Sequence, residues 1–168
     1  MSMPLSFRSA CLLGFAVCAG LMGYALYAQH GLGLEPCPLC ILQRIAVIAT
    51  GVVFLVAGLH APRSHGRWVY ALAAFTTAAT GAGVASRHVW LQSLPADQVP
   101  ACGPGYDYMM EAFPFAEALK MIFSGSGECA EVDWTFLGQS MPVWTLAAFI
   151  GLAIWALAGA AITRRSVD

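Results

Sequence analysis

The sequence predicts an all-α membrane protein: a bundle of four transmembrane helices with one long loop that carries a short amphipathic helix. Two observations support this fold. The 168 residues are 59% hydrophobic and only 10% charged, whereas a soluble domain has about 25% charged residues. Such a chain has too little polar surface to face water on all sides, so lipid is its expected solvent. Its apolar residues also fall into four runs, each close to the roughly 20 residues that a membrane-spanning helix needs.

The four predicted spans are the apolar runs at residues 10–28, 41–59, 68–86 and 143–162. Each is expected to be a helix, because backbone groups in lipid must pair within their own segment. The first run is longer than the roughly 7–15 apolar residues of a signal peptide, which favours an uncleaved anchor. We interpret residues 1–168 as a single membrane domain with outer loops at 29–40 and 87–142. The chain has no basic stripe, which excludes nucleic acid as a partner.

Basic residues predict how the spans are oriented. They occur at the N-terminus, in the short link between the second and third runs, and at the C-terminus: Arg8, Arg63, Arg67, Arg164 and Arg165. With four spans these regions share one side, and the excess of Arg marks that side as cytoplasmic. Both termini are then cytoplasmic. The opposite, outer side carries most of the acidic residues: Glu35, Asp97, Asp107, Glu111, Glu117, Glu128, Glu131 and Asp133.

A short amphipathic helix is predicted within the long loop, at residues 108–123. This segment is apolar, with Glu111, Glu117 and Lys120 interspersed. Pro114 is expected to start the helix or to kink it. Two interpretations stay open at this point. The helix lies on the membrane surface, or it packs under the loop's own fold.

Four of the six cysteines fall on the outer side: Cys37, Cys40, Cys102 and Cys129. Disulfides persist outside the cytoplasm, and four cysteines permit three pairings. Local closure favours a Cys37–Cys40 disulfide, which leaves Cys102 to pair with Cys129 across the long loop. The entropy of closing that loop grows only slowly with its length. Two further cysteines lie within the first span and are interpreted as packing residues: Cys11 and Cys18.

The residues around Cys40 favour a thiolate. Cys40 is expected at the start of the second span, where the helix dipole stabilises negative charge. Arg44 follows one helical turn later on the same face, and Pro38 stiffens the loop. A charge at the margin of an apolar run indicates function or snorkelling to the headgroups, and the nearness of Cys40 favours function. For His88, at the outer end of the third span, an interfacial role and a ligand-binding role both stay open.

Three segments carry a resemblance to a known family. They are EPCPLCILQR at 35–44, RHVWLQ at 87–92 and GECAEVDWTFLGQSMPVW at 127–144. With these segments the chain resembles the DsbB family, inner-membrane quinone reductases that reoxidise the periplasmic thiol oxidase DsbA. The specific part is a C-x-x-C-x-x-x-R motif that opens the second of four spans, with two more cysteines in the last outer loop. The resemblance covers nearly the whole chain.

The resemblance implies a disulfide-generating thiol:quinone oxidoreductase in the bacterial inner membrane, with its cysteine loops in the periplasm. A reduced DsbA-like partner, a thioredoxin-fold oxidase, would attack Cys102 of a Cys102–Cys129 disulfide. Cys129, once released, would exchange with Cys37 of the Cys37–Cys40 disulfide. Cys40 would then be the thiolate that faces the quinone.

For the quinone, the resemblance implies binding by Arg44, with His88 near the ring, and ubiquinone or menaquinone as the cofactor. Reduction potentials indicate that the electrons must end on a strong acceptor. DsbA is an oxidant at about −120 mV, and an ordinary structural disulfide lies below about −300 mV. That gap opposes electron transfer from DsbA by about 8 kcal/mol at about 1.4 kcal/mol per 30 mV. A lipid-soluble quinone at the membrane margin can supply the missing driving force.

Three alternatives compete with this interpretation. A vitamin K epoxide reductase-like enzyme would run thiol chemistry in the opposite direction, but this chain is too short to include a thioredoxin-like domain. A structural Zn²⁺ could bind four thiolates, yet such sites show two close cysteine pairs, and an oxidising compartment disfavours them, so we predict no metal. A four-span scaffold or channel would leave the clustering of cysteines on the outer side unexplained.

Overall fold

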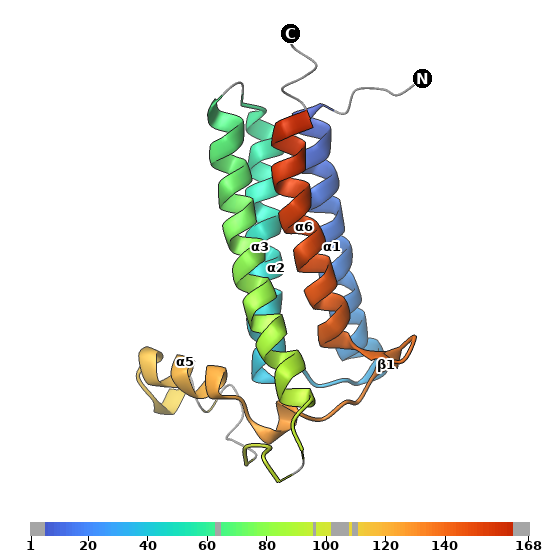
Figure 1. Cartoon of the computed structure of the whole chain (residues 1–168), viewed down its shortest axis with the longest axis vertical. Coiled ribbons are helices and arrows are strands. Elements are labelled where there is room, and N and C mark those ends of the chain that lie inside the picture. The colour runs from blue at the N-terminus through green and yellow to red at the C-terminus, as the bar shows by residue number, and fades with distance from the viewer. Residues whose placement is uncertain (1–5, 63–64, 96, 102–107, 109–110, 163–168) are drawn as a thin grey trace.

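Four long helices stand side by side in the computed structural model, which describes residues 6–62, 65–95, 97–101, 108 and 111–162 (Figure 1). They are α1 (Phe7–Leu32), α2 (Pro38–His60), α3 (His65–Gln92) and α6 (Met141–Ile162). Within this described part of the chain, these four helices are long and apolar enough to cross a membrane. The predicted all-α bundle of four transmembrane helices is therefore confirmed.

The two ends of the bundle differ in what they carry. The start of α1, the end of α6 and the α2–α3 link lie together at one end, here called the terminal end (Figure 1). The other end, here called the cysteine end, carries the α1–α2 link and the long region between α3 and α6. Which compartment each end faces stays a prediction. Some residues used for the sequence predictions lie outside the described part of the chain: Arg63, Cys102, Asp107, Arg164 and Arg165.

The helices extend beyond the apolar runs that predicted them. At the cysteine end α1 continues to Leu32, so the link to α2 is much shorter than the expected 29–40 loop. Helix α3 continues past residue 86 to Gln92, which places His88 inside a helix. The reason is physical. Hydropathy marks where lipid ends, but Gln, Arg and His continue a helix in water at little cost. Helix α1 ends where Gly33 adopts a left-handed conformation at φ 68°.

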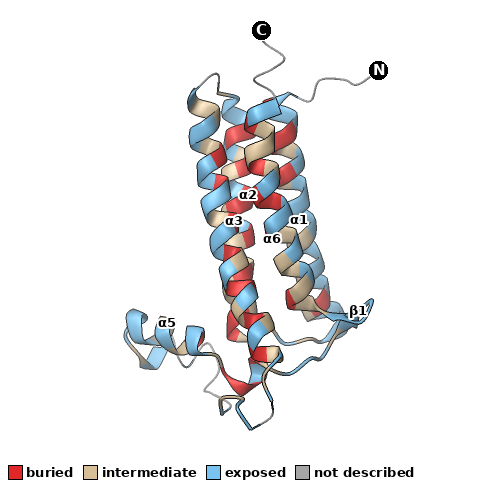
Figure 2. Cartoon of the chain, viewed as in Figure 1, coloured by how far each residue is buried: buried red, intermediate tan, exposed pale blue. Residues whose placement is uncertain are grey.

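Small residues set the close packing of the bundle interior. Buried alanines of α3 lie in one core with residues of α1, α2 and α6. A Cβ added at Gly51 of α2 would lie 3.1 Å from Cys18 Cβ of α1. Polar contacts join further helix pairs: Thr50 Oγ1 donates to Thr77 Oγ1 at 3.0 Å. Figure 2 shows buried residues facing inward and exposed ones facing outward, as expected for a bundle whose outer surface meets lipid.

The cysteine end is built from short elements between α3 and α6. They are α5 (Phe115–Ser124), the 3₁₀ turn η1 (Gly127–Cys129) and a hairpin of β1 (Thr135–Phe136) and β2 (Gln139–Ser140). The strands are antiparallel, with Thr135 opposite Ser140. Helix α5 projects sideways from the bundle (Figure 1). The hairpin leads directly into α6, so the region between α3 and α6 is continuous with a bundle helix at each of its ends.

Of the amphipathic helix predicted at 108–123, the part after Pro114 is confirmed as α5, and Pro114 is its N-cap residue. Its C-terminal end is fixed to the bundle by Arg87, which donates to the carbonyls of Phe123 at 3.2 Å and Ser124 at 2.9 Å. A cation at the carbonyl end of a helix is favourable. Ile122 is buried in a cluster that includes Leu91. This end of α5 therefore packs against the protein, and contact between its exposed face and the membrane stays a prediction.

Candidate functional site

The first cysteine pair forms the N-terminus of α2. Cys37 is the N-cap residue and Pro38 follows at the first helical position, where its missing N–H costs nothing. The Cys37 sulfur accepts the backbone N–H of Cys40 at 3.4 Å. The Cys37 thiol also donates to Cys40 Sγ at 3.0 Å. A disulfide needs about 2.05 Å, so the two sulfurs are not bonded here, and the Cys37–Cys40 disulfide stays a prediction.

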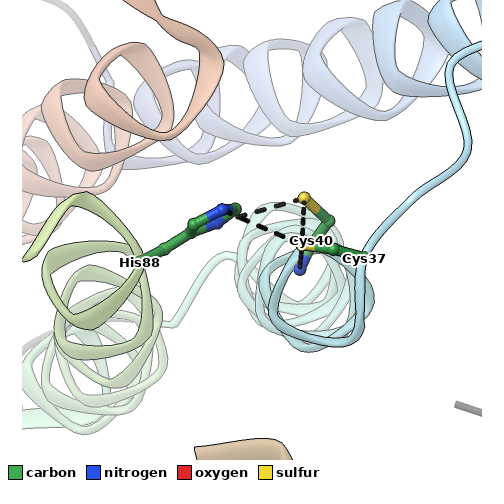
Figure 3. Close-up of side chains that lie close together, drawn as sticks. All are labelled: Cys37, Cys40 and His88. Carbon is green, nitrogen blue, oxygen red and sulfur yellow. Dashed lines mark hydrogen bonds between the residues drawn. The ribbon is translucent and has the colours of Figure 1, made fainter. Parts of the chain in front are cut away.

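His88 lies directly beside this pair (Figure 3). Its Nε2 is 3.8 Å from Cys37 Sγ and its Nδ1 is 4.0 Å from Cys40 Sγ. The imidazole is only 3% exposed, because α3 continues as a helix past the apolar run. Gln43 of α2 is buried as well, and its Nε2 lies 3.0 Å from His88 Nδ1. The structure therefore brings the predicted His88 to both thiols and adds Gln43 as its partner.

Arg44 reaches toward α1 at the edge of the same site. Its guanidinium donates to the side-chain carbonyl of Gln29 and, at 3.1 Å, to the backbone carbonyl of Ala25. A guanidinium has five N–H donors, so these contacts leave donors for a ligand. Arg44 lines the same cavity as Cys40. Its predicted role in holding a thiolate and a quinone stays a prediction.

Cys129, in the region between α3 and α6, lies close to the first pair, because Cys37 packs against its cluster. It lies in η1 and is fully buried, in a cluster with Leu39 and Leu91. Hydrogen bonding to Cys37 and burial together raise the pKa of the Cys129 thiol far above its ordinary value. Ser126 Oγ lies 3.7 Å from its sulfur. Its predicted partner Cys102 lies outside the described residues, so the Cys102–Cys129 disulfide is untested.

A cavity of about 370 Å³ opens beside these side chains at the cysteine end. Volumes of about 300–1,000 Å³ are usual for small-molecule sites. Its lining includes apolar side chains such as Leu21, Met22 and Val47. It also includes the polar and thiol groups of the site: Cys37, Cys40, Gln43, Arg44 and His88. A cavity that combines apolar lining with convergent polar groups can admit a flat, largely hydrophobic ligand.

Three ligand atoms of residues that line this cavity could also hold a metal ion. The donor atoms of Cys37, Cys40 and His88 all lie within 4.8 Å of one another. This group differs from the four-cysteine zinc site weighed from the sequence, because His88 replaces the outer-loop cysteines. Cys11 and Cys18, in contrast, are buried in the bundle interior, where they pack against α2.

The chain matches the family model described as "Disulfide bond formation protein DsbB" over residues 7–159. It is also similar to curated proteins named "Disulfide bond formation protein B". The one from Hahella chejuensis is 59% identical over 90% of this chain and 92% of its own length. That from Nitrosococcus oceani is 57% identical over 92% of each chain.

The chain belongs to the DsbB family. The resemblance drawn from its motifs is therefore confirmed, and with it a role in disulfide bond formation. The roles of the individual residues stay predictions.

Three residues of the site escaped the sequence-based prediction. Gln43 falls within the EPCPLCILQR segment, but nothing in the sequence pairs it with a residue 45 positions away. Gln29 falls in the predicted 29–40 loop, yet it lies on α1 and binds Arg44. Arg87 falls within the RHVWLQ segment, but nothing in the sequence indicates that it binds the end of α5. A helical projection that continues beyond the apolar runs could have signalled Gln29, since residues 25 and 29 share one face.

Proposed function

We propose that this DsbB-family protein passes electrons from a reduced, DsbA-like thiol oxidase to a membrane quinone through its two outer cysteine pairs. The protein would act as a thiol:quinone oxidoreductase in the bacterial inner membrane, with its cysteine end in the periplasm. The observation that carries the proposal is that Cys37 packs against the buried cluster that holds Cys129. This packing places the region between α3 and α6 beside the C-x-x-C pair, and that pair lines the cavity.

The contact supports a defined order of thiol exchange. The partner's thiolate would attack Cys102 of the Cys102–Cys129 disulfide, forming a mixed disulfide and releasing Cys129. The Cys129 sulfur would then attack Cys37 Sγ of the Cys37–Cys40 disulfide, so that a Cys129–Cys37 bond forms and Cys40 leaves as a thiolate. The partner's second thiol would then attack the partner's own sulfur in the mixed disulfide and release Cys102 as a thiolate. Cys102 would attack Cys129 in the Cys129–Cys37 bond, which restores the Cys102–Cys129 disulfide and releases Cys37. That step moves the electron pair onto Cys37 and Cys40.

The fit of a quinone is supported by the cavity. Its volume of about 370 Å³ and its apolar lining residues suit the substituted ring of a quinone. Arg44 and His88 would offer hydrogen bonds to the ring oxygens, and Cys40 lines the same cavity. When bound, ubiquinone or menaquinone would accept the two electrons of the Cys37–Cys40 pair and leave as a quinol. The chain's own contribution is to orient these groups and to exclude water through the buried cluster around Cys129.

Quinone reduction by the purified protein in detergent, with reduced DsbA as the donor, tests the proposal. We expect loss of quinone absorbance that depends on protein concentration and is abolished by Cys102→Ser. A Cys11→Ser variant is the matched control, because it removes a thiol from the bundle interior. Absence of reduction, with quinone bound and all four outer thiols intact, would contradict the proposed direction of electron flow.

A further inference from the structure

We propose that the reduced site binds one thiophilic divalent cation, such as Zn²⁺ or Cd²⁺, through Cys37, Cys40 and His88. The bound ion would block thiol exchange. The binding itself is independent of the proposed function, and only the inhibition rests on it. The ion is a reversible inhibitor in this proposal and not a structural component.

The donor geometry is close to that of a zinc site. Zinc bonds of about 2.3 Å to sulfur and about 2.0–2.1 Å to nitrogen imply tetrahedral separations of about 3.8 Å between sulfurs and about 3.6 Å between sulfur and nitrogen. The observed separations are 3.0 Å for the Cys37 and Cys40 sulfurs and 3.8 Å from Cys37 Sγ to His88 Nε2. The two sulfurs need to part by less than about 1 Å, which side-chain rotation provides.

Gln43 supplies the outer contact that a metal-bound histidine requires. A ligating imidazole nearly always donates its other N–H to a carbonyl, carboxylate or water. His88 Nε2 lies 3.8 Å from Cys37 Sγ and is assigned as the ligand atom. Nδ1 lies 4.0 Å from Cys40 Sγ but only 3.0 Å from the Gln43 amide, so it is assigned as the outer nitrogen. With the amide turned to present its oxygen, Gln43 accepts the Nδ1–H. Gln43 is 5% exposed and has no part in the proposed thiol exchange. Its contact with His88 therefore offers a role for this buried amide.

The cavity completes the site and gives it access. It reaches all three ligands, so a water molecule can take the open fourth position that zinc accepts beside three protein ligands. Four carboxylates also line it: Glu35, Glu128, Glu131 and Asp133. Their negative charge raises the local concentration of cations.

The chemistry links binding to redox state. Two thiols lose their protons to solvent as two metal–sulfur bonds form, and no electron is transferred. The Cys37–Cys40 disulfide offers no thiolate, so the oxidised form does not bind the ion. With the ion bound, Cys37 can neither receive Cys129 nor return to the disulfide.

Titration of the reduced, metal-free protein in detergent with CdCl₂ tests the site. The readouts are the thiolate-to-cadmium charge-transfer absorption and the bound metal per chain. We expect one ion per reduced chain, none after chemical oxidation of the thiols, and loss of the ion in Cys40→Ser. The double variant Cys102→Ser/Cys129→Ser is expected to keep it. Loss in that double variant would instead assign the ion to a four-cysteine site, and retention in Cys40→Ser would overturn the proposal outright.

Two variants of Gln43 test the outer contact. Loss of such a contact typically lowers metal affinity about 10–100-fold, and this is the expected effect of Gln43→Leu. Gln43→Glu is expected to restore affinity, because a carboxylate accepts the same N–H. Circular dichroism and gel filtration establish that each variant is folded. Equal affinity in Gln43→Leu and the parent chain would overturn the assignment of His88 as a ligand held by Gln43.

The outcome is separable from that of the proposed function. The titration contains neither quinone nor a thiol donor. Metal binding without quinone turnover would leave this inference standing and contradict the proposed function. Turnover without metal binding would do the reverse. Where both are found, turnover is expected to fall in proportion to the fraction of chains that hold the ion.

Discussion

Two cysteine pairs on neighbouring helices have very different surroundings. Cys11 and Cys18 of α1 are each 4% exposed and lie in the bundle core. Cys37 and Cys40 at the start of α2 have both nitrogens of one imidazole within 4.0 Å and line a cavity. The same side chain is thus a small apolar group in one place and a group with polar partners and ligand access in the other. Access and polar neighbours, rather than residue type, distinguish a working thiol from a packing one.

The comparison extends to the two regions that hold the pairs. In the core, glycine and alanine let the helix backbones approach, as at Gly51 and Gly81. At the cysteine end, longer and polar side chains from α1, α2, α3 and α6 surround the cavity. Close packing leaves no room for chemistry, so the bundle core is expected to supply stability, and the cysteine end to supply reactivity.

The sharpest test of this division is Cys40→Ser. Serine keeps the size of the side chain but cannot form the disulfide or release a thiolate, so we expect quinone-linked turnover to fall to background. Thermal unfolding in detergent is expected to change little, since Cys40 lies at the cavity and not in the core. Full activity in Cys40→Ser would mean that the C-x-x-C pair is not on the electron path.

A substitution in the bundle core is expected to lower stability and leave turnover unchanged. A Cβ at Gly81 of α3 would overlap the buried ring of Phe149 on α6. Gly81→Ala is therefore expected to destabilise the bundle by about 1–3 kcal/mol through overpacking, while turnover per folded molecule is retained. Gly83→Ala is the matched control, because nothing lies within 4 Å of its added Cβ. Unfolding temperature in detergent separates the two, and equal values would show that the α3–α6 contact is loose.

Arg44 stands between the two regions, since it both lines the cavity and binds α1. Arg44→Ala is expected to raise the quinone KM about tenfold, equivalent to about 1.4 kcal/mol of binding. It also removes hydrogen bonds from a charged donor, worth about 1.5–3 kcal/mol each, so some loss of stability accompanies it. Gln29→Leu frees the guanidinium from α1 without removing it. An equal rise of KM in both variants would make Arg44 a helix anchor and not a ligand.

Cys129 offers a test by pH. The hydrogen bond with Cys37 and burial favour its neutral thiol, which raises its pKa above the ordinary 9.0. Only the thiolate is alkylated, so the alkylation rate of Cys129 in reduced protein is expected to keep rising above pH 9, where an ordinary thiol levels off. Cys37→Ala should move the profile to lower pH. Peptide mass spectrometry measures both, and identical profiles would mean that Cys129 does not depend on Cys37.

The sequence predicts the bundle well because hydropathy and span length follow from the solvent that each segment faces. It also predicts the outer cysteines, Arg44 and His88, because these residue types are costly or reactive at a membrane margin. Hydropathy does not predict how each helix rotates against its neighbours. That rotation depends on packing across all four helices, and it determines that His88 faces the thiols and that Gln43 faces His88.

The long-range contacts of the region between α3 and α6 could not be predicted from the sequence either. The contact of Cys129 with Cys37 depends on how α5 and η1 are held. Arg87 binds the end of α5, and Ile122 packs with Leu91 beside Cys129. Each of these contacts is local in space but distant in the chain, so no periodicity or spacing records it. The sequence therefore predicts candidate residues, and the structure adds the contacts that bring Cys37, Cys40 and His88 together.

The smallest expected effect belongs to the core cysteines. Cys18→Ala keeps the Cβ that contacts Gly51 and removes only the sulfur, so we expect a cost of about 1 kcal/mol, typical of a single substitution. Turnover should be unchanged, and the same holds for Cys11→Ala. Cys18→Ser has the same size as the parent residue but adds a hydroxyl to an apolar helix contact, so it should destabilise more than alanine. If serine were tolerated better than alanine, Cys18 would have a polar partner, and the contrast between the two cysteine pairs would weaken.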